Sequence, residues 1–431
     1  MESNSNYWLE MIGEPKMDMI KHDVIVIGAG IIGISIALKL QSEGRQVLVL
    51  DSKGVAAETS SGNAGAFAFA DVIPLATPGI MRKAPKWLVD PLGPLSLRPA
   101  YVLKIIPWML RFWRASWQDK YQAALAAQAS LMDLSKAALE RQIDAVNGEA
   151  MIRREGQLQL YEGQAEFNAS LAGWQTRQEH GVVYEFLITP EAIAEIQPGI
   201  DPRFTHAAYT PEWKNVCDPA EWTQHLANEF EKRGGKIAIA SIHSIDLKDN
   251  SVNLKSDSAD YETNQVIIAA GAWSKTLAQS IGDNLPLDTE RGYNTTLQAG
   301  AFDLKTHLTF SNHGFVVTKI GEGVRVGGAV ELGGLHLKPN YKRADVLLNK
   351  AADFLPGLKI EGGKQWMGFR PSMPDSLPVI SYASRSKRVI YAFGHGHLGL
   401  TQSAGTAELV AALINNGTPD IDLTPFSSDR F

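Results

Sequence analysis

The sequence predicts an α/β protein of two interleaved parts, one built on a parallel sheet and one, of α+β type, on a mixed or antiparallel sheet. Three observations predict this fold class. Residues 23–51 read as a strand, a glycine-rich turn, a helix and a second strand. Apolar strands at 236–240 and 265–270 return to the same parallel sheet far along the chain. Residues 292–330 alternate in polarity between glycine turns, which is typical of antiparallel strands.

The first of these stretches has the pattern of a dinucleotide-binding unit. The apolar strand 24–27 leads into Gly-x-Gly-x-x-Gly, and a helix to about residue 42 precedes the strand 47–50. The three glycines permit the turn, the approach of a pyrophosphate and close helix packing, and the helix N-terminus offers N–H groups to phosphates. The acid after the second strand is placed to bond a ribose that lacks a 2′-phosphate. The unit therefore predicts a Rossmann-type domain with cofactor contacts from Gly28, Ala29, Gly30, Ile31, Ile32, Gly33, Asp51 and Ser52.

Length and composition restrict the function classes. A chain of 431 residues favours two domains, and its hydrophobic content of 45% is ordinary for a globular protein. The net charge of −6 gives no support to nucleic-acid binding. The single cysteine, Cys217, excludes an intrachain disulfide and a multi-cysteine zinc site, and we expect no metal. It fits a reducing compartment, so we expect a cytoplasmic protein, with the inner face of the membrane as an open alternative.

The N-terminal part contains two segments of undecided role. Residues 1–20 have no apolar core of signal-peptide length and read as a flexible extension, with Met17 or Met19 as alternative starts. Residues 74–118 are rich in Pro and Trp. Within them, 101–117 place apolar and aromatic side chains beside Lys104, Arg111 and Arg114. Such a segment either lies at a membrane interface or packs as a helix on the body of the protein, and both remain open.

The remaining elements follow from periodicity and caps. Helices are expected at 118–146, at 190–196 after a Thr189 cap, at 219–233, at 342–354 and after the glycine-rich residues 394–401 to about 414. Strands are expected at 158–161 and 389–393. We expect a cofactor domain of residues 21–75, 205–285 and 365–431, and a substrate domain of residues 76–204 and 286–364.

Two further stretches point to the type of dinucleotide. Residues 58–67 are mostly small or hydroxyl-bearing, so their backbone can press against a flat ligand. Residues 394–401 form a glycine-rich entry to a helix, whose N-terminal dipole favours a group that gains negative charge. A flavin gains such charge on reduction, whereas an oxidised nicotinamide is positive. The sequence therefore favours FAD over NAD.

Five motifs in order carry a resemblance to a known family. They begin at Gly28 (Gly-x-Gly-x-x-Gly), Glu58 (Glu-Thr-Ser-x-x-Asn-Ala-Gly), Ala269 (Ala-Ala-Gly-Ala-Trp-Ser), Gly368 (Gly-x-Arg-Pro-x-x-Pro-Asp) and Gly394 (Gly-His-Gly-x-x-Gly). The set resembles the D-amino-acid oxidase-type (DAO) family of FAD-dependent oxidoreductases, nearest to its bacterial D-amino-acid dehydrogenases, over nearly the whole chain after residue 22. The resemblance implies noncovalent FAD under a roof formed by the second sheet. It also implies flavin contacts from Thr59, Ser60, Asn63, Ala64, Gly65, Ile242, Ala270, Gly271, Trp273, Gly394, Gly396, Leu398, Gly399 and Thr401.

Candidate substrate residues lie in the second half of the chain. Arg370 can bind a carboxylate through two parallel hydrogen bonds, as the resemblance implies, or it can pair with Asp375. Tyr293 either closes over the substrate or packs in the core. Arg291 is equally suited to a structural ion pair, and Glu331 either meets a substrate amine or stabilises the sheet. The histidines His395 and His397 are not needed as bases, because a neutral amine and the flavin suffice.

These residues predict oxidative deamination of a small amino-acid substrate. Hydride leaves the α-carbon for flavin N5, and the imine hydrolyses to a 2-oxo acid or, if cyclic, is retained. The D configuration comes from the resemblance alone. Departures at 371–375, 381 and 397–400 keep open a secondary amine such as D-proline or D-hydroxyproline, sarcosine, or glycine. A non-catalytic flavin relay or redox sensor is the alternative of a different class. The electron acceptor is open among oxygen, a quinone and a partner flavoprotein.

Overall fold

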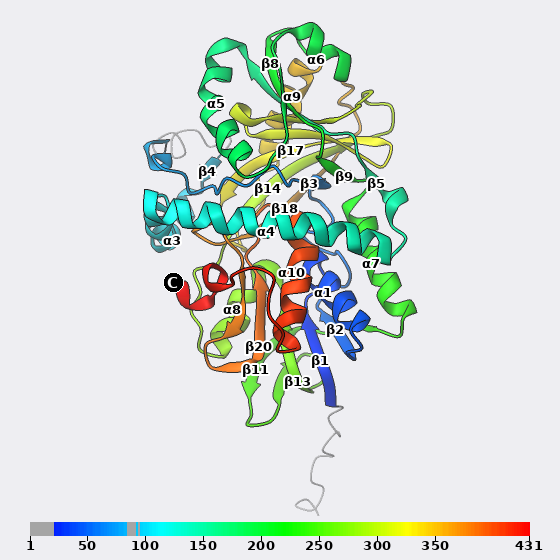
Figure 1. Ribbon diagram of the computed structural model, residues 1–431, viewed down its shortest axis with the longest axis vertical. Helices are drawn as coiled ribbons and strands as arrows, with labels where there is room; N and C mark the ends of the chain where they lie inside the picture. Colours follow the sequence, from blue (N-terminus) through cyan, green and yellow to red (C-terminus); the bar gives the residue numbers. More distant parts are fainter. Residues whose placement is uncertain (1–20, 84–91, 94) are drawn as a thin grey trace, which may run out of the picture.

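A computed structural model describes residues 21–83, 92–93 and 95–431, and the expected N-terminal extension, residues 1–20, lies outside the described residues. Two large sheets make up the protein, one above the other in Figure 1. The long helix α4 (Gln118–Ala145) crosses the middle of the molecule between them. This arrangement confirms the expected α/β class, with a parallel-rich sheet and a mixed, mostly antiparallel sheet.

The parallel-rich sheet has β1 at its centre, between β2 and β13. Strand β13 continues in parallel to β20 and in antiparallel to β12, so the sheet divides at this point. The carboxyl ends of the parallel strands therefore meet along one edge, where α/β proteins bind their ligands. The strands are β1 (Lys21–Ile27), β2 (Val47–Asp51), β10 (Lys236–Ile239), β11 (Ile242–Leu247), β12 (Val252–Ser256), β13 (Tyr261–Ile268), β19 (Val379–Ala383) and β20 (Ser386–Phe393).

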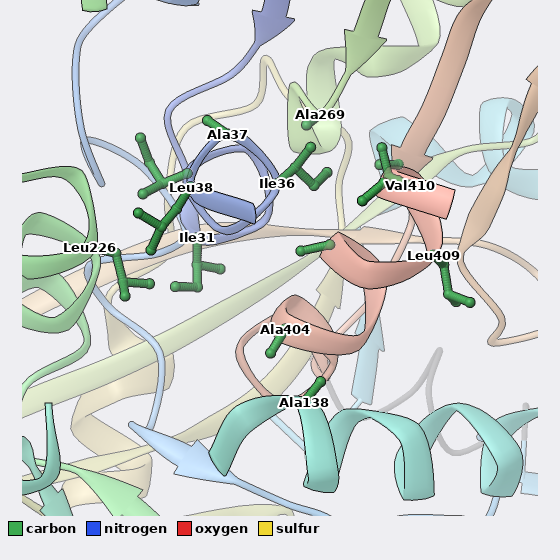
Figure 2. Close-up of a cluster of buried hydrophobic side chains, with 14 of the residues drawn as sticks. Ile31, Ile36, Ala37, Leu38, Ala138, Leu226, Ala269, Ala404, Leu409 and Val410 are labelled. Atoms are coloured by element: carbon green, nitrogen blue, oxygen red, sulfur yellow. The ribbon is translucent and has the colours of Figure 1, made fainter. Parts of the chain in front are cut away.

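A cluster of buried side chains fixes the helices that cover this sheet. Helix α1 (Ile31–Ser42) contributes eight buried residues, and it packs between α7 (Pro219–Lys232) and α10 (Gly399–Ile414). Figure 2 shows Leu38 of α1 beside Leu226 of α7, and Ala404 of α10 above Ala138 of α4. The small residues allow close approach, since a Cβ at Gly405 would lie only 2.4 Å from Oγ of Ser135. Helix α4 therefore anchors on the cofactor-side core, although its segment was assigned to the substrate domain.

The second sheet runs in the order β18-β14-β17-β16-β15-β6-β8-β7, and β4 lies beside β17. Its pairs are antiparallel except β15 with β6 and β17 with β4. Strands β8 and β18 fall in segments that the sequence assigned to the cofactor domain, yet both lie in this sheet. The strands are β4 (Leu95–Leu97), β6 (Gln157–Glu162), β7 (Glu185–Leu187), β8 (Phe204–Thr210), β14 (Asp288–Leu297), β15 (His307–Phe310), β16 (Phe315–Ile320), β17 (Gly323–Leu332) and β18 (Lys364–Ser372).

Among the described residues, two α-helices begin at a side-chain cap, and the sequence predicted the first of these caps. Thr189 accepts a hydrogen bond from the Ala192 N–H and caps α6 (Pro190–Ile196), and Asp218 caps α7 in the same way. Helix α9 (Lys342–Phe354) has the predicted bounds. Helix α5 (Gly163–Glu179) was not anticipated, because its sequence shows little apolar periodicity. The other elements are α3 (Val102–Ala115), α8 (Ser274–Ser280) and a small sheet of β3 (Ala66–Phe67), β9 (Lys214–Val216) and β5 (Ile152–Arg153).

Candidate active site

A cavity of about 1060 Å³ lies between the carboxyl edge of the parallel-rich sheet and one face of the mixed sheet. Most of the predicted site residues line it, from both sheets and from the loops after β2, β13 and β20. They are Gly28, Gly30, Ile31, Ile32, Asp51, Ser52, Thr59, Ser60, Asn63, Ala64, Ile242, Ala270, Gly271, Trp273, Gly396, Gly399, Tyr293 and Arg370. Six predicted site residues are not part of this lining: Ala29, Gly33, Gly65, Gly394, Leu398 and Thr401.

The turn after β1 has no room for side chains. Gly28 has φ +113°, and a Cβ there would lie 2.4 Å from the carbonyl oxygen of Ala269 at the end of β13. A Cβ at Gly33 would lie 1.9 Å from the carbonyl oxygen of Gly28. The first turn of α1 carries no acidic residue, so its N–H groups face the cavity edge without a competing negative charge.

Asp51 ties the end of β2 to this turn. One carboxylate oxygen accepts from the Ala29 N–H at 2.8 Å, and the other accepts from Lys53 and Gly54 N–H groups at 2.7 and 2.9 Å. The acid is partly buried and borders the cavity, which is where a ribose hydroxyl has to reach it.

The loop of residues 58–67 is held against the mixed sheet by polar bonds. Thr59 donates to the Phe369 carbonyl at 2.8 Å. Asn294 donates to the Gly62 carbonyl at 2.7 Å, and Arg325 to the Asn63 carbonyl at 2.6 Å. A Cβ at Gly62 would lie 2.3 Å from the Trp366 ring. Sequence reasoning missed Asn294, Arg325 and Trp366, although alternation along their strands places them on one face.

Arg370 reaches the cavity through a gap that a glycine leaves. Its guanidinium crosses Gly292 of β14, where a Cβ would lie 2.4 Å from Nη2, and Nη1 donates to the Ala329 carbonyl at 3.0 Å. Ala329 has φ +55°, and β17 is irregular opposite Gly292. Burial lowers the pKa of Arg370 while Glu290 raises it, and an arginine stays charged under both influences. The alternative pairing with Asp375 is wrong, because that carboxylate binds Arg430, with Nε at 2.7 Å.

Tyr293 borders the cavity, but its side chain is engaged within the mixed sheet. The side chain is 1% exposed. Its hydroxyl donates to Oε1 of Glu331 at 2.9 Å and accepts from the Asn340 N–H. Arg291 pairs with the same carboxylate, with Nη1 at 3.3 Å. The sequence left two roles open for Tyr293; its burial and these bonds fit packing in the core, and closure over the substrate stays a prediction. Arg291 and Glu331 take the structural roles weighed for them.

The loop before α10 borders the cavity with Gly396, His397 and Gly399. Gly394 and Gly396 have φ +88° and +56°. The Thr401 hydroxyl accepts from the Ala68 N–H at 3.0 Å and so joins α10 to β3. His395 is buried and its Nε2 bonds the Thr406 hydroxyl, whereas His397 opens into the cavity. Burial lowers the pKa of both rings, so both are neutral at pH 7.

Two buried histidines predict a loss of stability in mild acid. Burial lowers the pKa of His307 and of His395 to about 3. Below about pH 6.5 the unfolded chain binds protons that the folded chain excludes, so each histidine costs about 1.4 kcal/mol per pH unit. His395→Asn should therefore lower the slope of the unfolding free energy against pH by about that amount between pH 6 and 5. Urea unfolding with FAD in fixed excess measures it. His336→Asn, at an exposed histidine outside the cavity lining, is the control. Equal slopes for wild type and His395→Asn would contradict the exclusion of a proton from buried His395.

Comparisons with known proteins agree on one family. The model of the family DAO, FAD dependent oxidoreductase, matches residues 23–413. A D-amino-acid oxidase of Bradyrhizobium diazoefficiens is 36% identical over 95% of this chain and 98% of its own. A D-amino acid dehydrogenase of Rhizobium johnstonii is 31% identical over 95% and 99%. In structure, glycine oxidase from Geobacillus kaustophilus has a TM-score of 0.75 at 20% identity, over 95% of this chain and 99% of that one, which shows the shared fold.

The residues of the cavity fit the cofactor of that family. The turn at Gly28–Gly33 leaves the space that side chains would fill, and a Cβ at Gly30 would lie 3.0 Å from Oγ of Ser60. Asp51 stands at the end of the second strand, and the 58–65 loop and the α10 entry border the cavity beyond it. A diphosphate, a ribose and a flat ring therefore each have a matching wall.

Proposed function

This chain belongs to the DAO family of FAD-dependent oxidoreductases, and from that premise we propose that it catalyses the oxidative deamination of a D-amino acid. The names of its relatives, D-amino-acid oxidase and D-amino acid dehydrogenase, support the substrate class. The observation that carries the proposal is the cationic Arg370. It lines the cavity from strand β18 of the mixed sheet and matches a substrate carboxylate.

Each part of the cavity has a role in this reaction. FAD, when bound, supplies the acceptor of two electrons and of the hydrogen on the substrate α-carbon. The Gly28–Gly33 turn and α1 would hold its diphosphate, Asp51 its ribose, and the 58–65 loop with the α10 entry its ring. Arg370 holds the carboxylate and so restricts the orientation of the α-carbon, which contributes to rate. The amine must be neutral to lose hydride, and the imine product hydrolyses in water to a 2-oxo acid.

Two alternatives remain proposals of lower rank. A secondary amine such as D-proline or sarcosine also carries the carboxylate that Arg370 would bind. A flavin relay subunit would have no use for a half-buried arginine in a cavity of this size.

The test is anaerobic mixing of the holoenzyme with D- and L-amino acids while the visible flavin band is recorded. We expect bleaching by at least one D-amino acid and none by its L enantiomer. Bleaching by secondary amines alone would replace the substrate class, and no bleaching by any amine would favour the relay. Admission of air afterwards separates an oxidase, which recovers its colour, from a dehydrogenase.

We also propose that α3 rests on an anionic lipid surface. Its outward stripe is apolar, with Leu103, Leu110 and Trp113 exposed by 83%, 57% and 49%. The helix carries Lys104, Arg111 and Arg114 and no acidic residue, in a protein whose net charge is negative. No helix in the described part of the chain is long and apolar enough to cross a bilayer. Such contact would bring the enzyme to a quinone acceptor.

A vesicle assay checks this surface. We expect binding to phosphatidylserine vesicles, reduced about 5-fold by Lys104→Gln because each cation near an anionic surface contributes about 1 kcal/mol. Leu110→Ser should weaken it further, and Lys136→Gln, far along α4, should not change it. Equal binding of wild type and both α3 variants, or dimerisation through the stripe in light scattering, would contradict the proposal.

A further inference from the structure

A buried acid shares the cavity with Arg370. Glu290 of β14 is 7% exposed and lines the cavity. It stands directly opposite Arg370 in the register of β14 and β18. Directly paired residues of antiparallel strands point to the same face, so both side chains face the cavity.

The two charges are neighbours without being partners. Arg370 turns toward Gly292 and Ala329, and among the described residues the Glu290 carboxylate takes part in no hydrogen bond or ion pair. A carboxylate that is buried without a partner is unfavourable, and it becomes favourable when a cation binds it. The cavity therefore holds an anion and a cation side by side, each with room for a ligand of opposite charge.

We propose that Glu290 binds the amino group of the substrate while Arg370 binds its carboxylate, so that the pair recognises α-amino acids as zwitterions. This inference rests on the proposed function and deepens it. An α-amino acid carries both charged groups on one carbon, which suits two side chains from neighbouring positions on adjacent strands. Glu290 is less suited to the cationic side chain of a substrate such as D-lysine. That charge lies several bonds from the substrate carboxylate, so with the carboxylate on Arg370 the side chain would have to fold back to reach Glu290.

The surrounding charges leave Glu290 available for this role. The groups that face it are Arg370 from β18 and His397 from the loop before α10, with Asp71 beyond that histidine. His397 is neutral at pH 7, since burial and Arg370 lower its pKa against the opposite effect of the two acids. The nearest acid on the same strand face, Asp288, bonds the Tyr101 hydroxyl at 3.0 Å and is occupied.

The charge of Glu290 has opposite effects on binding and on reduction. The carboxylate stabilises the protonated amine, which strengthens binding and raises the pKa of the bound amine. Only the neutral amine releases hydride, so the rate of flavin reduction falls at low pH, where the bound amine is protonated. Because the carboxylate raises the pKa of that amine, it moves this fall, the acid limb of the pH profile, to higher pH. Glu290→Gln should therefore weaken binding of a D-amino acid about 10- to 100-fold at pH 7, the usual size of a charged hydrogen bond. It should also move that limb to lower pH.

The experiment uses anaerobic stopped-flow reduction of the holoenzyme by the best D-amino acid with an uncharged side chain, at several pH values. Propionate, which has the carboxylate and no amine, is titrated in parallel through its effect on the flavin spectrum. We expect Glu290→Gln to weaken binding of the amino acid. Binding of propionate should be unchanged or tighter. The variant removes a buried charge without changing shape, and a thermal melt verifies its fold. Glu212→Gln, half exposed on the surface, is the control.

Three outcomes would overturn the inference. Unchanged binding and an unchanged acid limb in Glu290→Gln would remove Glu290 from the substrate site. D-Lysine and D-arginine are measured in the same assay, and a loss confined to them would assign Glu290 to the substrate side chain instead. A wild-type flavin that no D-amino acid bleaches would refute the proposed function itself, and this inference with it, whereas the first two outcomes leave the proposed function standing.

Discussion

Replacement of Arg370 by alanine should raise the dissociation constant of the amino-acid substrate about 30- to 4,000-fold. Loss of one partner of a desolvated charge pair costs about 2–5 kcal/mol, and each 1.4 kcal/mol is a factor of ten. Among the described residues the guanidinium bonds only the Ala329 carbonyl, so its other donors can bind a carboxylate. Anaerobic titration of the flavin band measures the change, and the maximal reduction rate should also fall because the α-carbon loses its orientation.

Arg370→Lys separates charge from geometry. Lysine keeps the positive charge but lacks the planar pair of donors. We therefore expect a dissociation constant between those of wild type and Arg370→Ala. Arg141→Ala removes an exposed arginine paired with Glu408 and should leave binding unchanged. Gly292→Ala tests the seat of the side chain, because its methyl would occupy the place of Nη2. Full turnover by Arg370→Ala would leave the relay function as the better explanation.

Local sequence signals predicted the cofactor side of the molecule. The strand, turn, helix and acid of residues 23–51 are contiguous, so their geometry follows from short-range rules, and the structure has β1, α1 and β2 at those places. Helices α4, α6, α7 and α9 were predicted for the same reason, since caps and periodicity are local. The domain boundaries are not of this kind: β8 and β18 join their sheet through pairing with distant strands.

The substrate-facing residues depend on the register of strands in the mixed sheet, which cannot be read from the sequence. Whether Tyr293 or its neighbours face the cavity depends on the register of β14 against β18 and on the irregularity of β17 at Ala329. A shift of one residue exchanges the two faces, so the sequence left the role of Tyr293 open and gave no sign of Glu290. Asn294 and Arg325 were missed for the same reason. A lone acid in a β segment has no motif that would reveal it.

Replacement of Gly28 by alanine should give a protein that no longer retains FAD. The residue has φ +113°, and its Cβ would lie 2.4 Å from the backbone oxygen of Ala269, which β13 holds in register with β1. Strain at such a φ costs about 1–3 kcal/mol and the overlap about 1–3 kcal/mol more. The ends of β1 and β13 are also the wall of the diphosphate site, so any relief of the overlap changes that wall.

Gly44→Ala is the matched control, because it also has a positive φ, +85°, but no atom within 4 Å of its Cβ. It should lose stability from strain alone and keep its FAD, since it ends α1 far from the turn. The ratio of flavin to protein absorbance, followed by FAD titration of the apoprotein, compares the two. We expect the Gly28 variant to bind FAD at least about 30-fold more weakly than the Gly44 variant, as about 2 kcal/mol requires. Equal FAD affinity in the two variants would show that the turn tolerates a side chain, and the tight approach of β1 to β13 would then not be what shapes the cofactor site.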